Sequence, residues 1–289
     1  MNLRKRICPI VVILLFAPTF RATASSLVVL KPETVSAWND YVHTVRARAQ
    51  ERLHSMQPFL RIDEDQNAGD RVRDGEVLVS PVGKTPRAVP AGLIHDWVGT
   101  AFLPNVTLEQ VLSTVRDYDS YKLFYGPTVL NSKTLVKGGS EDRFSMVLAN
   151  KSLIAKTALG GDYTSSYVRV DSHHWYGILE ATRIQEIEKY GTPAEHALRE
   201  DEGTGLIWRA LTITRFEERD GGVYIEVEAI VLSRDVPRAL RWAITPIVRR
   251  VSKDSLITSL RQTDRAVHSR DSGPVQASGA LTNTVRSFR

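Results

Sequence analysis

The residues with the clearest capacity for acid–base chemistry lie beside one predicted turn. Glu226 and Glu228 are two residues apart in the run VYIEVEAIVL, which follows Asp220-Gly221-Gly222. Two carboxylates in different surroundings can act as a general acid and a general base. The alternative is that both side chains lie on the solvated face of a β-sheet, because residues i and i+2 of a strand share a face.

The predicted turn favours the second interpretation. A two-residue turn at Asp220-Gly221 places Arg215 opposite Glu226, and a turn at Gly221-Gly222 places Arg215 opposite Glu228 with the same two faces. Either register forms a cross-strand ion pair, worth about 0.2–1 kcal/mol. We therefore expect a solvated, salt-bridged face rather than an acid–base pair.

The opposite face of this hairpin combines aromatic side chains with small or weakly polar ones. Its predicted members are Trp208, Ala210, Thr212, Thr214, Phe216, Ile225, Val227, Ala229 and Val231. Small residues between aromatic ones leave room for a ligand. The alternative is an ordinary core that a C-terminal helix fills.

The sequence lacks the local motifs of metal binding, phosphate binding and serine hydrolysis. There is no HExxH motif, and His173-His174 lies in a predicted turn where adjacent imidazoles point apart, so we expect no metal site. No glycine pair has the setting of a phosphate-binding loop. Ser233 and Ser255 lack a GxSxG elbow, so a Ser/His/Asp site would have to assemble from distant residues. We expect no cofactor.

The first 24 residues have the pattern of a signal peptide. Arg4, Lys5 and Arg6 precede an apolar run over 7–16, and Ala22-Thr23-Ala24 supplies the small residues of a cleavage site. The run is shorter than the roughly 20 residues of a transmembrane helix. We expect a periplasmic or secreted protein, with an uncleaved membrane anchor as the alternative.

Removal of this segment changes the charge of the chain. The whole sequence has 38 basic and 33 acidic residues, and residues 1–24 hold four of the basic ones and no acidic one. The remaining 34 basic and 33 acidic residues nearly balance, so charge gives no support for a nucleic-acid partner. The single cysteine, Cys8, lies in the signal, so no disulfide is expected in the mature chain.

Hydrophobic spacing predicts the remaining elements. Residues 25–91 form a helix over 33–56, with Arg46, Arg48 and Arg52 on its solvated side, and then a connector with one short strand. In the main domain, 92–268, a strand ends at Pro104 and a helix follows a Thr107–Gln110 capping box. The segment from about 128 to 236 contains only strands and turns. A kinked or two-piece helix covers 237–268, and 269–289 form a disordered tail.

The order of elements in 92–268, with the segments DWVGTAFLP, TLEQVLSTVRDYDSY and GLIWRALTITRFEERDGGVYIEVEAIVLSRDVP, resembles the START-like (SRPBCC) superfamily. That family includes the birch pollen allergen, lipid-transfer domains and polyketide cyclase-like proteins. The resemblance implies an α+β helix-grip fold. In that fold a curved antiparallel sheet of about seven strands wraps around a long C-terminal helix, and here an N-terminal helix is added. It also implies an apolar cavity for a lipid or another hydrophobic molecule.

Strand alternation and this fold together give a set of candidate ligand-binding residues. They are Trp97, Tyr163, Tyr167, Trp175, Arg183, Trp208, Ala210, Thr212, Val227, Ala229 and Trp242. Arg183 has the same strand phase as Trp175, so it could direct a charge at a ligand carboxylate or phosphate. Core packing is the alternative for each aromatic residue, and a surface or ion-paired side chain is the alternative for Arg183.

Three functions remain open from the sequence. The first is an exported, non-enzymatic binding or carrier protein for a hydrophobic small molecule or lipid. The second is a cyclase, dehydratase or hydrolase that uses polar groups in the same cavity. The third is an interaction module with a filled groove, whose arginine-rich first helix contacts a protein partner or an anionic membrane. The sequence does not indicate an oligomeric state.

Overall fold

The computed structural model describes residues 27–150, 157–236 and 238–271. The predicted signal peptide and the tail beyond Asp271 lie outside these residues. Inside them, ten strands form one antiparallel sheet whose main path runs β2-β4-β12-β11-β8-β7-β6-β5. Its long strands are β4 (Gly92–Pro104), β5 (Val129–Val136), β6 (Asp142–Asn150), β7 (Thr157–Arg169), β8 (His174–Glu188), β11 (Arg209–Arg219) and β12 (Gly222–Arg234).

Shorter strands extend the sheet and add a small second one. β2 (Leu78–Pro81) and β3 (Arg87–Val89) both pair with β4, and β9 (His196–Ala197) pairs with β8. β1 (Val28–Val29) and β10 (Glu202–Gly203) pair with each other. The seven long strands agree with the predicted number. β3 and the strands of the 189–203 loop were not predicted, because each has only two or three residues.

Five α-helices accompany the strands in the described residues: α1 (Pro32–His54), α2 (Gln66–Arg73), α3 (Leu108–Val115), α4 (Tyr121–Phe124) and α5 (Arg241–Asp271). Single 3₁₀ turns cover Arg61–Glu64, Tyr118–Ser120 and Arg238–Leu240. Thr107 and Gln110 form the predicted capping box of α3. α2 is an error of prediction, because its polar sequence was interpreted as a connector. α5 runs on through Pro246, so it is one helix rather than two.

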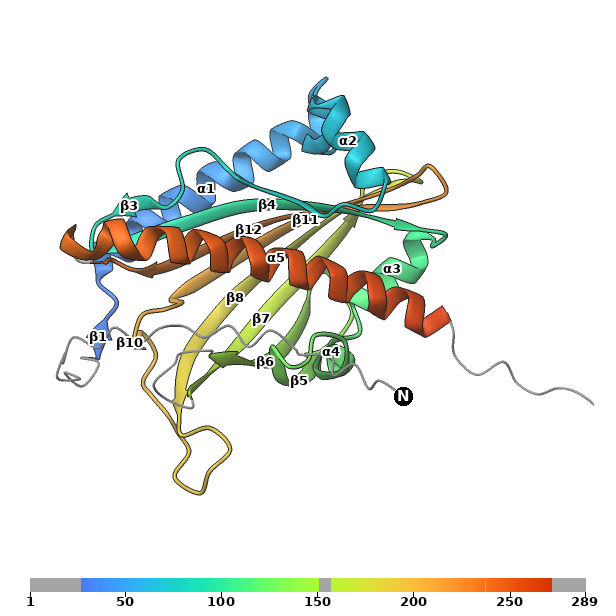
Figure 1. Cartoon of the computed structure of the whole chain (residues 1–289). Coiled ribbons are helices and arrows are strands. Elements are labelled where there is room, and N and C mark those ends of the chain that lie inside the picture. Colours follow the sequence, from blue (N-terminus) through green and yellow to red (C-terminus); the bar gives the residue numbers. More distant parts are fainter. Residues whose placement is uncertain (1–26, 151–156, 237, 272–289) are drawn as a thin grey trace, which may run out of the picture.

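Two helices cover opposite faces of the sheet (Figure 1). α5 packs on the face that carries Trp97, Ala101 and Leu103 of β4, with Leu256 and Leu260 as its contact residues. α1 packs on the other face, against β4, β11 and β12, through Trp38, Val45 and similar residues. We call these the α5 face and the α1 face. The arrangement is the predicted helix-grip fold with an added N-terminal helix.

The β11–β12 hairpin has the register that a turn at Asp220-Gly221 predicts. Arg219 pairs with Gly222 and Arg215 pairs with Glu226. Asp220 and Gly221 have φ values of +55° and +74°, which two-residue hairpin turns of this type require and which glycine and aspartate tolerate. The turn therefore fixes which side chains of both strands lie on the α5 face.

Candidate functional site

The centre of the α5 face is only partly covered. On β11 and β12 Thr212, Val227 and Ala229 of this face are partly exposed, whereas Phe216 and Ile225, nearer the turn, are buried. On the same two strands the residues of the α1 face, such as Leu211 and Ile230, are buried. The sheet therefore presents a floor of small and apolar groups on the α5 face, and part of this floor stays accessible to solvent.

The reason lies in how α5 packs. Its C-terminal half lies closely against β4, where a Cβ on Gly99 would come within 2.8 Å of Leu256 and 3.0 Å of Leu260. Its N-terminal half is largely exposed, with Ile247 at 63% and Val251 at 58%. The C-terminal half of the helix is thus packed closely on β4, whereas several apolar side chains of its N-terminal half face solvent and Arg249 of that half donates to the Thr85 carbonyl of the β2–β3 segment.

Aromatic residues close one end of this face. Tyr118 stacks on Phe144 with ring centroids 4.2 Å apart, and Phe144 stacks on Tyr163 at 5.2 Å. Tyr121 packs edge-on against Phe144, and its hydroxyl donates to the Val115 carbonyl. These rings form a buried aromatic wall, in which Tyr118 and Phe144 are fully enclosed and Tyr163 is 6% exposed.

A charged group lies behind this wall. Asp142, which is 2% exposed, accepts hydrogen bonds from the Tyr118 hydroxyl (2.8 Å), from Arg116 and from the Gly138 amide. Although burial acts in the opposite direction, these hydrogen bonds hold the pKa of Asp142 below its usual value. A carboxylate held so firmly in its charged form supports structure and is a poor proton carrier.

A second polar pair lies elsewhere on the α5 face. His95 of β4 and Ser233 of β12 approach each other with Nε2 and Oγ 3.0 Å apart. Burial lowers the pKa of His95 to about 4, so its ring is neutral at pH 7. Within the described residues, no carboxylate is hydrogen-bonded to its other ring nitrogen. The pair has the elements of a weak base and a hydroxyl, without the third group of a triad.

Eight of the eleven candidate residues lie on the α5 face. Strand register and cluster membership place there Trp97, Tyr163, Tyr167, Trp175, Ala210, Thr212, Val227 and Ala229. They span the floor and the aromatic wall. Their contact with a ligand remains a prediction.

Arg183 lies on the opposite face, so its proposed contact with a ligand is wrong. An irregularity in the β7–β8 pairing, where Asp162 faces Arg183 but Tyr163 faces Ala181, leaves Thr182 as an extra residue. This bulge reverses the strand phase, and Ile184 takes the place on the α5 face. Arg183 instead forms an ion pair with Asp162 at 2.7 Å, as the alternative interpretation held.

Two tryptophans are also misplaced by the prediction. Trp208 comes just before β11, outside the regular alternation, and packs in the α1-face cluster with Leu30 and Trp38. Trp242 lies on the N-terminal half of α5 and is 81% exposed. Helical position alone could not distinguish the inner side of α5 from its outer side, because only half of the helix is packed.

The glutamates of the hairpin are buried, not solvated. Glu226 and Glu228 are 0% and 1% exposed, because α1 and the 59–64 segment cover the α1 face. Arg215 donates to Glu226 at 3.1 Å, and Arg61 donates to both glutamates through its amide (2.7 Å) and its side chain (3.1 Å). The ion pair was predicted correctly and its surroundings were not, since alternation shows a face but not what covers it.

The arginines of α1 belong to the same network. Arg48 is hydrogen-bonded to Glu228, Arg46 pairs with Glu180 of β8 at 2.6 Å, and Arg52 pairs with Glu64. These arginines are ion-paired, and the side chains of Arg46 and Arg48 are still 37% and 39% exposed, so the prediction of a solvated face is correct only in part. Arg46 and Arg48 attach α1 to the sheet, and Arg52 attaches it to the 61–64 turn.

Proton affinities in this network follow from burial. Burial raises the pKa of Glu226, and the neighbouring Arg215 opposes that shift. Burial and the nearby Glu228 raise the pKa of Asp96 to about 7, while its hydrogen bond from Tyr41 acts in the opposite direction. All of these groups lie on the α1 face, so none faces the floor under α5.

Two further features were not found in the described residues: a metal-binding group and a membrane-spanning helix. These residues contain no group of three histidine, cysteine, aspartate or glutamate side chains placed to hold a metal ion. They also contain no helix that is long and apolar enough to cross a bilayer.

Comparison with known proteins gives matches in structure only. No family model matches the chain, and no curated protein matches it. A fragment of the STAR-related lipid transfer protein from Xanthomonas axonopodis has 13% identity and a TM-score of 0.45, over 66% of this chain and 98% of that one. Human STARD10 has 10% identity and a TM-score of 0.43, over 72% and 81%. Zhui aromatase/cyclase from Streptomyces sp. R1128 has 9% identity and a TM-score of 0.43, over 63% and 99%. Likenesses this distant carry no functional argument, so the fold is assigned here from the strand order and the two helices of the chain itself.

Proposed function

We propose that this protein is a non-enzymatic binding or carrier protein for a hydrophobic small molecule or lipid, which lies between the sheet and the N-terminal half of α5. The observation that carries the proposal is the contrast between the two faces of β11 and β12. Thr212, Val227 and Ala229 on the α5 face are partly exposed, whereas their neighbours on the α1 face are buried. Partly exposed apolar surface on the sheet face that α5 covers is suited to a guest molecule.

The binding free energy of such a ligand is favourable without any contact to charged side chains. A ligand that buries about 400 Å² of apolar surface gains about 10 kcal/mol at roughly 25 cal/mol per Å². An association cost of about 4 kcal/mol, the low end of the range, leaves about 6 kcal/mol. That value corresponds to a dissociation constant of some tens of micromolar. More extensive contact with the partly exposed groups of the floor would tighten it.

Export and membrane contact are part of the same proposal. Residues 1–24 supply the export signal, and the exposed Trp242, Ile247 and Val251 of α5 give apolar surface at the open side of the floor. A carrier that loads at a membrane needs such surface near its ligand site.

The test fills the floor with a bulky side chain. Ala229→Trp and Thr212→Trp each place an indole on the α5 face, between β4 and β8. Thr182→Trp is the matched control, because Thr182 is the exposed bulge residue of β8. Binding of the dye Nile red, followed by fluorescence, should weaken about tenfold or more in the first two variants and stay unchanged in the control. Equal binding in all three would contradict the proposal.

A hydrolytic activity is the second candidate, because His95 and Ser233 lie within hydrogen-bond distance on this face. The neutral imidazole would take the Ser233 proton while Oγ attacks an ester carbonyl, and the alcohol would leave as it gains that proton. Water, deprotonated by the same imidazole, would then attack the acyl-serine, and the carboxylic acid would leave as Ser233 regains its proton. A fluorophosphonate probe and a 4-nitrophenyl ester series test this. Labelling and turnover that Ser233→Ala abolishes would establish the hydrolase, and absence of both in the folded wild type would exclude it.

A further inference from the structure

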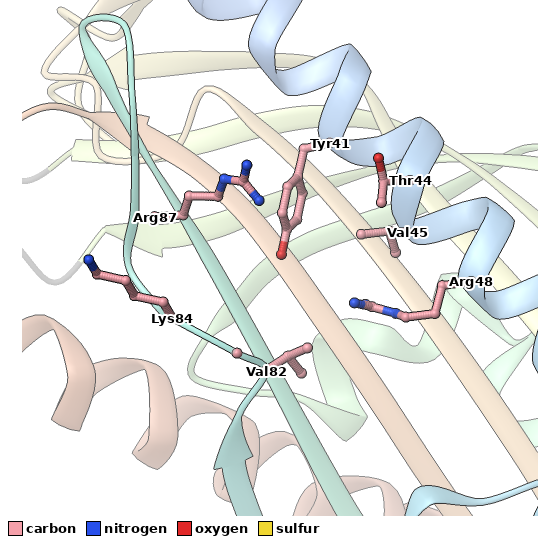
Figure 2. Close-up of a pocket in the computed structure, with 8 residues that line it drawn as sticks. Tyr41, Thr44, Val45, Arg48, Val82, Lys84 and Arg87 are labelled. Atoms are coloured by element: carbon pink, nitrogen blue, oxygen red, sulfur yellow. The ribbon is translucent and has the colours of Figure 1, made fainter.

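A separate pocket lies on the α1 side of the sheet, away from the floor under α5. Its volume is about 340 Å³, and its walls are α1 and the segment that joins β2 to β3. The residues around it are Tyr41, Thr44, Val45, Arg48, Val82, Gly83, Lys84 and Arg87 (Figure 2). A second hollow of about 260 Å³ adjoins it and shares Tyr41, Thr44 and Arg87. This is the size range of small-molecule sites.

The wall formed by the β2–β3 segment is fixed in place from two sides. The Thr85 hydroxyl accepts from the Asp96 amide of β4 at 2.9 Å, and the Thr85 carbonyl accepts from Arg249 of α5 at 2.7 Å. The Val82 amide also donates to the Asp96 carbonyl at 3.0 Å. The opposite wall is attached to the sheet by the Arg48–Glu228 bond. A pocket whose walls are both held is largely pre-formed, which reduces the cost of binding.

Positive charge surrounds this pocket. Figure 2 shows the guanidinium groups of Arg48 and Arg87 directed toward the Tyr41 ring from two sides, and the Lys84 ammonium at the rim, directed away. The Arg87 guanidinium lies 5.4 Å from the centre of that ring. Among the described residues, no carboxylate lies within ion-pair distance of Arg87 or Lys84, in contrast to Arg48.

Besides Glu228, which pairs with Arg48, two carboxylates lie near the pocket, and neither pairs with Arg87 or Lys84 in the described residues. Asp40 lines the adjoining hollow, where it is exposed to solvent, and it makes no ion pair with Arg87 in the described chain. Asp96 lies beneath Tyr41, whose hydroxyl donates to its Oδ2 at 2.7 Å, and Arg48 is 3.7 Å from the same atom. Since burial raises the pKa of Asp96 to about 7, this group carries only part of a negative charge at neutral pH.

The remainder of the lining is apolar. The Tyr41 ring, Val45 and Val82 form the inner surface, and Ile94 and Val89 continue it into the adjoining hollow. We propose that this pocket is a second ligand site, independent of the floor under α5. It takes a small organic carboxylate with an apolar or aromatic body, which the Arg87 guanidinium binds at the rim. A guanidinium pairs with a carboxylate in a planar, bidentate manner, and the Tyr41 ring offers a face for the body of the ligand.

The test uses a matched pair of probes. 4-(Trifluoromethyl)benzoate carries the charge, and 4-(trifluoromethyl)benzamide has nearly the same shape without it. Each is titrated with the full chain and followed by ¹⁹F NMR. The protein variants are Lys84→Gln with Arg87→Gln, and the control Lys133→Gln with Arg143→Gln, which removes two exposed charges from β5 and β6.

The benzoate should bind with a dissociation constant below about 1 mM. Loss of the charge-assisted contact should weaken binding about tenfold or more in the Lys84/Arg87 variant and for the benzamide. The control variant and Ala229→Trp should bind the benzoate as the wild type does. Equal binding of the two probes, an equal loss in the control, or no binding at about 5 mM would overturn the proposal. Displacement of the benzoate by an equal concentration of inorganic phosphate would overturn the requirement for an apolar body.

Discussion

Replacement of Arg215 by methionine is the sharpest test of the charge network under α1. Arg215 and Glu226 are 1% and 0% exposed, and one 3.1 Å hydrogen bond joins them. Arg215→Met keeps the length of the side chain and removes its charge. It leaves Glu226 with only the Arg61 amide as a described hydrogen-bond donor, in a place that water does not reach.

The size of the effect follows from this burial. Removal of one partner from a buried ion pair costs about 3–5 kcal/mol, because the remaining charge has no compensation. In a chain of this size each kcal/mol shifts the melting temperature by about 2–4 °C, so the expected loss is about 6–20 °C. A solvated pair, as the sequence alone predicts, would contribute at most about 1 kcal/mol.

A double-mutant cycle separates the pair from its surroundings. Glu226→Gln keeps an acceptor for the Arg61 amide while it removes the charge. Combined with Arg215→Met, it should recover about 2 kcal/mol or more of the loss, because no unpaired charge remains. Urea denaturation followed by circular dichroism measures all four proteins. Arg143→Met, an exposed site on β6, is the control and should change stability by at most about 0.5 kcal/mol. A loss below about 1 kcal/mol for Arg215→Met would refute the reasoning.

Three further predictions concern α5 and the α1 face. Asp96 keeps its proton up to a pH of about 7, whereas the unfolded side chain loses it near 3.8, so the wild type loses stability as pH rises between these values. Asp96→Asn lacks this titration, so its free energy of unfolding, measured by urea denaturation, should rise relative to that of the wild type between pH 4 and pH 7. A difference between the two free energies that does not change with pH would contradict the prediction. Gly99→Val should push α5 from β4, because a Cβ there meets Leu256 at 2.8 Å, with a loss of about 1–3 kcal/mol and faster amide exchange in α5. Unchanged exchange in α5 would count against that packing. Trp242→Ala should leave the melting temperature and the affinity for Nile red unchanged, because the side chain is 81% exposed. A clear decrease in either quantity would show that Trp242 belongs to the ligand site or to the core.

Local signals in the sequence predicted those parts of the fold that depend on neighbours in the chain. The Asp220-Gly221 turn determined the β11–β12 register, and the Thr107–Gln110 box determined the start of α3. Both are short-range features whose geometry the residue types dictate. The alternation that followed from the turn correctly placed Ala210, Thr212 and Ala229 on the α5 face.

The errors arose where a distant segment decides the outcome. Alternation assigned Glu226 and Glu228 to one face, but only the packing of α1 makes that face dry. Arg183 was assigned to the wrong face because the bulge at Thr182 comes from pairing with β7, and no residue type in β8 predicts a bulge there. Trp242 was misplaced because α5 is packed along only half of its length. The pocket between α1 and the β2–β3 segment depends on contacts between these two parts of the chain, which no local pattern contains.

Native mass spectrometry of the full chain, purified from cells that express it, tests the central claim most directly. The account predicts a hydrophobic adduct of one molecule per protein, which organic extraction releases and which Ala229→Trp abolishes. Recovery of empty wild-type protein in repeated preparations, or an adduct that survives unchanged in Ala229→Trp, would contradict a ligand site on the sheet face under α5.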